Sequence, residues 1–100
     1  MMKIIKESIA GTLESSDIQI IIVSNENAGI EINLKSSVEK QFGKQIRKVI
    51  TEVLKKMEIQ NVKLVAVDKG ALDCTIKARV ECAVCRACGI KEQYDWEVID

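Results

Sequence analysis

The stretch that decides the fold is residues 29–57, GIEINLKSSVEKQFGKQIRKVITEVLKKM, in which two hydrophobic periodicities follow each other. In its first part Ile30, Ile32 and Leu34 alternate with polar residues. This period of two is typical of a strand in a sheet with one covered and one solvated face. In its second part the apolar residues repeat at helical spacing, at Val38, Phe42, Ile46, Val49, Val53, Leu54 and Met57. The stretch therefore predicts a strand followed by a long amphipathic helix.

Polar and small residues of this helix add three expectations. Ser36 stands three residues before Glu39, which is the spacing of a capping box, so we expect the helix to begin at Ser36. Gly43 lies inside the helix, where glycine costs about 1 kcal/mol relative to alanine, and we expect it to allow close packing against the sheet. The basic residues form either a solvated face or a docking face for an acidic partner, and they are Lys40, Lys44, Arg47, Lys48, Lys55 and Lys56.

Shorter patterns on both sides predict the remaining elements. We expect strands and a second helix, the strands at 9–13, 18–24 and 62–67 and the helix at 72–87. Asp68 is expected to cap the start of the second helix and Gly89 to end it. Residues 25–28 have the composition of a hairpin loop. The predicted fold class is α+β, an antiparallel sheet of about four strands with two helices packed on one face, in the order βββαβα.

Length and composition limit the classes of protein that fit. One hundred residues, of which 47% are hydrophobic, predict a single domain over residues 1–100. A formal net charge of zero gives no general electrostatic case for binding nucleic acid or a membrane surface. The longest apolar run, residues 20–23, is much too short to span a bilayer, and the N-terminus does not resemble a signal peptide. We therefore expect a cytoplasmic protein.

The acidic tail at residues 90–100 contains two of the three aromatic residues, Tyr94 and Trp96. Aromatic side chains are enriched at the centres of protein interfaces. These two either fold back on the core or anchor a partner subunit, and we favour the partner.

Three of the four cysteines have the spacing Cys82-x-x-Cys85-x-x-Cys88, which resembles the start of an iron–sulfur motif. These cysteines fall within the helix expected at 72–87. Each step from i to i+3 turns about 300° around a helix, so the thiols would not converge on one metal. The chain also has no histidine. We expect reduced thiols that pack on or beside the buried face, and no metal site.

Residues 14–17, Glu14-Ser15-Ser16-Asp17, are the candidate functional site. This polar run lies between apolar segments, which predicts a tight turn between two strands with its tip in solvent. The turn is either plain turn chemistry or a serine that another enzyme can modify. Because the chain lacks a histidine that could act as general base, Ser15 is a weak nucleophile and no catalytic residue is expected.

Three blocks of sequence together resemble the acyl carrier (gamma) subunit family of citrate lyase. They occur in the same order and cover most of the chain, at 11–17 (GTLESSD), 36–43 (SSVEKQFG) and 68–74 (DKGALDC) followed by 78–81 (ARVE). The resemblance implies that Ser15 carries 2'-(5''-phosphoribosyl)-3'-dephospho-CoA through a phosphodiester. Ser16 offers a second hydroxyl and is the less favoured attachment point. In such a protein the chain is a tether, and the reactive atom is the thiol of the cofactor.

The resemblance also implies partners. The alpha subunit (acyl transferase) exchanges acetate for citrate on the thioester, and the beta subunit (citryl lyase) releases oxaloacetate and regenerates the acetyl form. A prosthetic-group transferase and an acetylating ligase act during maturation. Two alternatives stay open: the related carrier subunit of malonate decarboxylase, and a structural or interaction domain with an unmodified turn.

A charged arm would give the charges around the turn a further meaning. Glu14 and Asp17 either only form the turn or also repel the phosphates of the arm. The basic face of the first helix likewise could receive the arm as well as an acidic partner.

Overall fold

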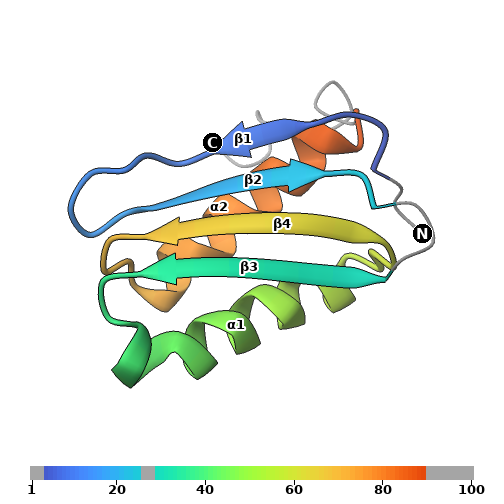
Figure 1. Ribbon diagram of the computed structural model, residues 1–100. Coiled ribbons are helices and arrows are strands. Elements are labelled where there is room, and N and C mark those ends of the chain that lie inside the picture. The colour runs from blue at the N-terminus through green and yellow to red at the C-terminus, as the bar shows by residue number, and fades with distance from the viewer. Residues whose placement is uncertain (1–3, 26–28, 90–100) are drawn as a thin grey trace.

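Four strands and two helices make up the computed structural model, which describes residues 4–25 and 29–89 (Figure 1). In chain order they are β1 (Ser8–Ala10), β2 (Ile18–Val23), β3 (Ile30–Ser36), α1 (Glu39–Lys56), β4 (Val62–Asp68) and α2 (Asp73–Ala87). The α+β class and the order βββαβα are confirmed. The tail at 90–100, with Tyr94 and Trp96, lies outside the described residues.

The sheet is mixed, so the expectation of a purely antiparallel sheet is wrong. The strand order is β1-β2-β4-β3, in which β2 runs antiparallel to β1 and to β4. β3 and β4 pair in parallel because α1 lies between them in the chain and returns it to the same end of the sheet. The segment at 25–28 therefore does not join neighbouring strands as a hairpin would, since β4 lies between β2 and β3.

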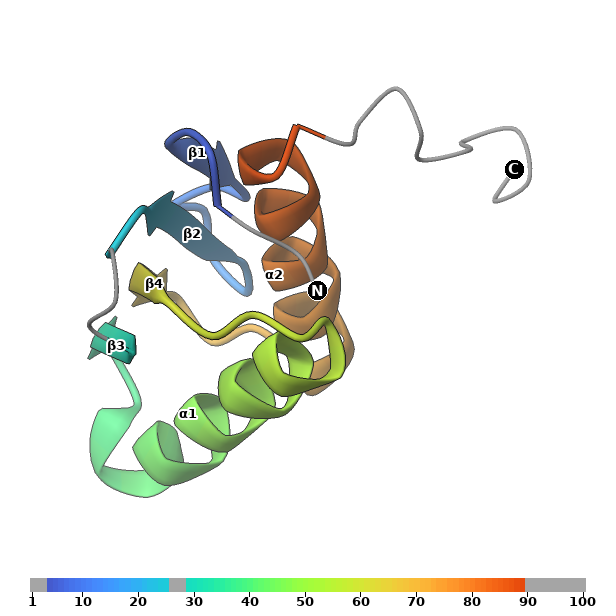
Figure 2. The ribbon, with the colours of Figure 1, turned by 90° about the vertical axis from the view of Figure 1, so that its right-hand side faces the viewer.

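Both helices cover the same face of the sheet, which Figure 2 shows from the side. The alternation along the strands decides which residues face them: Ile18, Ile20 and Ile22 of β2 are fully buried under the helices. Burial of an isoleucine or leucine side chain stabilises a fold by about 1.5–3 kcal/mol. On the opposite face, Ile9, Ile21 and Val65 are only partly covered or exposed and lie in one cross-strand row.

Neither expected helix cap is formed. α1 begins at Glu39 with Val38 as its N-cap residue, and α2 begins at Asp73 with Leu72 in that position. Ser36 is instead the last residue of β3. Its hydroxyl accepts a hydrogen bond from the Val38 N–H (3.0 Å) and donates one to the buried carboxylate of Asp68 (2.8 Å). The two residues bond to each other between neighbouring strands, and the helices begin further along the chain, at Glu39 and Asp73, so neither residue occupies the N-cap position.

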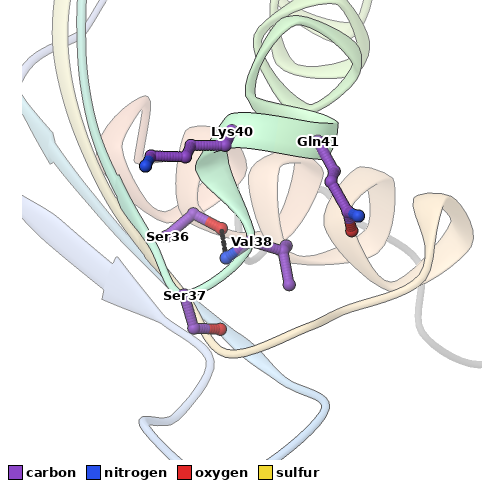
Figure 3. A pocket seen from close by; sticks show the side chains of 5 residues that line it. All are labelled: Ser36, Ser37, Val38, Lys40 and Gln41. Carbon is purple, nitrogen blue, oxygen red and sulfur yellow. Dashed lines mark hydrogen bonds between the residues drawn. The ribbon is translucent and has the colours of Figure 1, made fainter.

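An open hollow lies beside this junction of β3 and α1 (Figure 3). Its lining residues are Ser36, Ser37, Val38, Lys40 and Gln41. The dashed line in Figure 3 is the hydrogen bond between Ser36 and Val38 that sets the path of the chain into α1. Lys40 and Gln41 are exposed on the first turn of that helix.

The long helix α1 has the expected amphipathic character. Gly43 is buried, and the close packing against the sheet that we expect of it stays a prediction. Phe42, which the periodicity assigns to the core face, is 51% exposed. Most of the basic residues are exposed, as both interpretations of this face require, and they are Lys40, Lys44, Lys48, Lys55 and Lys56, while Arg47 is half-buried. A role of this face in docking stays a prediction.

The cysteines lie on α2 or just beyond its end, as expected. Cys85 is buried, and Cys82 and Cys88 pack against the core. Burial raises the pKa of the Cys85 thiol and of the Cys88 thiol above the ordinary value. Cys74 is exposed. Among residues 4–25 and 29–89, no three or more cysteine and carboxylate side chains are grouped so as to hold a metal ion.

The first strand is shorter than expected. β1 has three residues and ends at Ala10, whereas the strand was expected at 9–13. Gly11 follows with a φ of 88°, which turns the chain out of the extended conformation. The helix expected at 72–87 agrees with α2 to within one residue, and Gly89 follows its end with a φ of 70°. No helix in the part of the chain that the structure describes is long and apolar enough to cross a membrane.

Candidate modification site

The serine pair occupies the two central positions of a β-turn between β1 and β2. The Asp17 N–H donates a hydrogen bond of 3.2 Å to the Glu14 carbonyl, which closes the turn. Ser16 has a φ of 65° while Ser15 keeps a negative φ, and this combination is that of a type II turn. Glycine is the usual residue at the position of Ser16, so the serine there stores backbone strain.

Ser15 is exposed, as the sequence predicts for the tip of a turn. Among the described residues its hydroxyl has no hydrogen-bond partner, and the same holds for the Ser16 hydroxyl. The backbone of Ser16, in contrast, is bonded. The two hydroxyls are thus free to react while the chain that carries them is held in place.

The turn is joined to the central sheet by two backbone hydrogen bonds. The Ser16 N–H donates to the Lys69 carbonyl (2.8 Å), and the Lys69 N–H donates to the Asp17 carbonyl (2.8 Å). These bonds extend the antiparallel pairing of β2 and β4 beyond Ile18 and Asp68 through a β-bulge, in which Ser16 and Asp17 together lie opposite Lys69. Figure 1 shows the consequence: the loop from β1 to β2 and the loop from β4 to α2 leave the sheet at the same end.

The Asp17 carboxylate holds the loop from within. It accepts hydrogen bonds from the Thr12 hydroxyl (2.6 Å), the Thr12 N–H (3.2 Å) and the Ile18 N–H (2.7 Å). Arg79 of α2 adds two parallel bonds of 3.1 Å each, one from Nε and one from Nη2. Such a two-pronged contact fixes the relative orientation of both groups. The ion pair therefore ties the serine turn to the second helix.

These contacts change the acidity of the group. The hydrogen bond from the Thr12 hydroxyl has the largest effect and lowers the pKa of Asp17. Burial has the next largest effect and raises it, but the hydrogen bonds from Arg79 and Ile18 and the charge of Arg79 lower it further, so the pKa falls from 3.8 to about 2. Asp17 is therefore ionised in the folded protein at neutral pH. Its negative charge is paired with Arg79, which favours turn formation over repulsion of phosphates as its role. Glu14 is exposed.

Gly11 is required where the loop leaves β1. A Cβ atom at this position would lie 1.9 Å from the carbonyl oxygen of Ile18, far inside contact distance, and its φ of 88° already disfavours other residues. Only glycine lets the two arms of the loop approach this closely. Gly11 and Asp17 thus shape the loop at its two ends.

Sequence reasoning located Ser15, Ser16 and the turn but missed Arg79. Asp17 and Arg79 are 62 positions apart, and no spacing rule connects residues over that distance. The signal that could have found Arg79 is its place in one of the blocks shared with the citrate lyase carrier family. Lys69 was missed because its contacts with the turn are made by its backbone. Such contacts do not depend on which side chain the residue carries.

The arrangement can accept a group on the Ser15 hydroxyl, which is accessible. No hydrogen bond in the described part of the chain links this hydroxyl to a base that could remove its proton. Fold and turn together define a small domain that presents a serine on a rigid loop.

Comparison with known proteins gives the class of this domain. The family model described as the malonate decarboxylase delta subunit, an acyl carrier family, matches residues 5–87. A solved Pseudomonas malonate decarboxylase hetero-tetramer in complex with malonate contains a chain of the same fold, with a TM-score of 0.73 and 12% sequence identity, over 87% of this chain and 92% of that one. The domain is thus an acyl carrier by class.

Curated relatives are much closer in sequence. The citrate lyase acyl carrier protein of Latilactobacillus sakei is 59% identical over 99% of this chain and 96% of its own length. The proteins of the same name from Oenococcus oeni (56%, over 98% of this chain and 100% of its own) and Streptococcus mutans (54%, over 99% and 96%) are similar to it as well. The chain belongs to the citrate lyase acyl carrier protein family.

Proposed function

We propose that this chain is the acyl carrier subunit of a citrate lyase and that the Ser15 hydroxyl is the attachment point of its prosthetic group. The observation that carries the proposal is the exposed, unbonded hydroxyl on a turn whose backbone is hydrogen-bonded to Lys69. A covalent arm needs an accessible oxygen and a backbone that is held in place. Ser15 meets both needs. Ser16 carries the other hydroxyl of the turn, but its backbone has the left-handed conformation, with a φ of 65°, that the turn requires.

Membership in an acyl carrier family implies a covalently attached prosthetic group. We propose that this group is 2'-(5''-phosphoribosyl)-3'-dephospho-CoA, joined to Ser15 by a phosphodiester. The cofactor supplies a terminal thiol for thioester chemistry, and the protein supplies position. A prosthetic-group transferase and an acetylating ligase would load and acetylate it.

The proposed partners are the alpha and beta subunits of citrate lyase. On alpha, citrate replaces acetate on the thioester; on beta, the citryl thioester is cleaved to oxaloacetate and the acetyl form returns. A tethered thioester meets both sites at high effective concentration, so each transfer is effectively intramolecular. The chain has no catalytic residue in this scheme. We place it in the cytoplasm, where its four cysteines would remain reduced.

A carrier subunit of malonate decarboxylase is the second candidate, because the family model and the solved structure both bear that name. The 54–59% identity to citrate lyase carriers over nearly the whole chain favours citrate. An unmodified interaction domain is the third reading, and a mass measurement distinguishes it from the other two.

The test is to express the chain with its maturation enzymes and large subunits and to measure its intact mass and citrate cleavage. We expect the mass of one cofactor on the peptide that contains Ser15. Ser15→Ala should abolish both the added mass and citrate cleavage, whereas Ser16→Ala, the matched control next to it, should retain them. Loading and cleavage that survive Ser15→Ala would overturn the proposal.

A further inference from the structure

An apolar groove lies between the first turns of α1 and the loop from β4 to α2. Its volume is about 400 Å³, within the range of small-molecule pockets. Apolar side chains supply most of its lining, namely Val38, Phe42, Ile46, Ala71 and Leu72. Gln45 and Asp73 also line it, and the Gln45 amide donates a hydrogen bond of 2.9 Å to the Asp73 carboxylate. The groove is thus apolar, with hydrogen-bonding groups beside the apolar surface.

Two of its large apolar side chains are exposed. Phe42 is 51% exposed and Leu72 is 71% exposed. They come from different elements, α1 and the residue before α2, and line the same groove. A flat apolar group bound between them would cover surface that the isolated chain leaves in water.

The groove begins next to the serine turn. Ser16 donates its N–H to the carbonyl of Lys69, and Gly70, the next residue, already lines the groove. Consecutive Cα atoms are about 3.8 Å apart. Lys69, to which the serine turn is bonded, is thus one residue from the lining of the groove, and we expect a short linker on Ser15 to span the remaining distance.

We propose that the groove binds the adenine base of the prosthetic group. This inference rests on the proposed attachment of that group at Ser15. The arm consists of phosphates, sugars, amides and one purine, and the purine is its only large flat apolar part. It is also close to the protein, because one phosphate and one ribose separate the adenosine from the serine oxygen. Aromatic side chains stack on bases of any kind, and Phe42 offers such a surface.

Binding of the base would divide the arm into a fixed and a mobile part. The adenosine would lie against Phe42 and Leu72, and the pyrophosphate and the chain that ends in the thiol would extend from the far side of the groove. The point about which the thiol moves would then be the groove instead of Ser15. The Asp73 carboxylate is placed to accept a hydrogen bond from the exocyclic amino group of the base.

The test compares loaded and bare protein by NMR. Loaded protein is made with the maturation enzymes, and its mass is checked on the Ser15 peptide first. We expect nuclear Overhauser contacts between the adenine protons and the Phe42 ring and Leu72 methyl groups. Backbone amide shifts between the two forms should concentrate at residues 42–46 and 70–73. If the loaded protein shows shifts only at residues 14–17 and lacks those contacts, the base does not bind in the groove. The attachment of the group at Ser15 would still hold.

Two matched substitutions sharpen the result. Leu72→Ala should lower the contacts between adenine and Phe42 at least two-fold without changing the loaded mass. Ile9→Ala is the control, because Ile9 is 49% exposed but lies on the uncovered face of the sheet. It should leave the contacts unchanged. Equal effects of both substitutions would contradict the proposal, as would contacts that persist fully in Leu72→Ala. Absence of the added mass in the parent chain would refute both the attachment at Ser15 and the binding of the base in the groove.

Discussion

Two loops leave the same end of the sheet, and an aspartate holds each of them in a different way. In the loop from β1 to β2, Asp17 is partly exposed, with 13% of its side-chain surface accessible, and is paired with Arg79. In the loop from β4 to α2, Asp68 is 1% exposed, and its carboxylate bonds only neutral donors among residues 4–25 and 29–89, namely the Ser36 hydroxyl and the Ala71 N–H (3.0 Å). The aspartate of one loop has a charged partner near solvent as well as neutral donors, whereas the aspartate of the other is held by neutral donors inside the core.

The difference shows how one end of the sheet can present an accessible serine on a backbone that is held in place. Removing a partner of a buried hydrogen bond leaves another buried group unsatisfied, so the loop around Asp68 is expensive to disturb. A partly exposed ion pair contributes little to stability because water screens it. The ion pair of Asp17 and Arg79 therefore orients the loop that presents Ser15. The backbone hydrogen bonds to Lys69 fasten this loop to the more stable neighbouring loop.

The largest effect is expected from Asp68→Ala. The substitution leaves the Ser36 hydroxyl and the Ala71 N–H without their acceptor, and we expect the free energy of unfolding to fall by about 2–4 kcal/mol. Urea denaturation measures it. Asp68→Asn, which keeps one acceptor oxygen, should cost less. A loss below about 1 kcal/mol for Asp68→Ala would remove the contrast between the two loops.

A glycine in each loop gives the next comparison. Gly11→Ala should destabilise the fold by about 2–3 kcal/mol, because strain at its φ of 88° adds to a clash with the Ile18 carbonyl. Gly70→Ala has a similar φ of 92° but no atom within 4 Å of the added Cβ, so only the strain of about 1 kcal/mol remains. Urea midpoints of the two variants test this order. Equal losses would show that the close approach at Gly11 is unimportant.

Acid should weaken the contacts that hold the loop from β1 to β2. The pKa of Asp17 is about 2 in the folded chain and 3.8 ordinarily, so the folded state favours the ionised carboxylate. That contribution to stability is complete above about pH 4 and is lost as the pH falls toward 2. The stability difference between the parent chain and Asp17→Asn, from urea denaturation at low salt, should therefore shrink between pH 5 and 2. A difference independent of pH would show that the contacts of Asp17 with Thr12, Arg79 and Ile18 do not stabilise the fold through its ionised form.

The smallest effect is expected from Ser16→Gly. Glycine relieves the strain at a φ of 65°, but it also gains freedom in the unfolded chain, so the net gain should be below about 1 kcal/mol. Thermal unfolding measures this, and intact mass should show that loading at Ser15 is unchanged. A clear loss of stability would mean that the Ser16 side chain stabilises the turn.

The sequence predicted those parts of the fold that depend on local periodicity. The alternation around Ile20 and Ile32 and the helical spacing around Val49 identified the strands and helices within a few residues, because burial on one face imposes those periods. Alternation says which face of a strand is covered but not which strand lies beside it. The insertion of β4 between β2 and β3 was missed for that reason.

The errors at the helix ends and in the site share one physical cause. Ser36 and Asp68 are each good capping residues by local rules, yet their hydroxyl and carboxylate bond to each other over 32 positions. Arg79 reaches Asp17 over 62 positions. Such pairs depend on the three-dimensional arrangement, which a local pattern does not contain. Ser15 was found because turn tips are set locally and because the block around it matches a known family.

The bonds between Ser16, Asp17 and Lys69 have a mechanical consequence. They extend the ladder of the two central strands, so a pull applied at the Ser15 oxygen is transmitted along β2 and β4 as shear across several hydrogen bonds loaded in parallel. A free hairpin would instead bend and peel open one bond at a time. A group attached to this serine would therefore load the sheet along its strands, where several hydrogen bonds share the force.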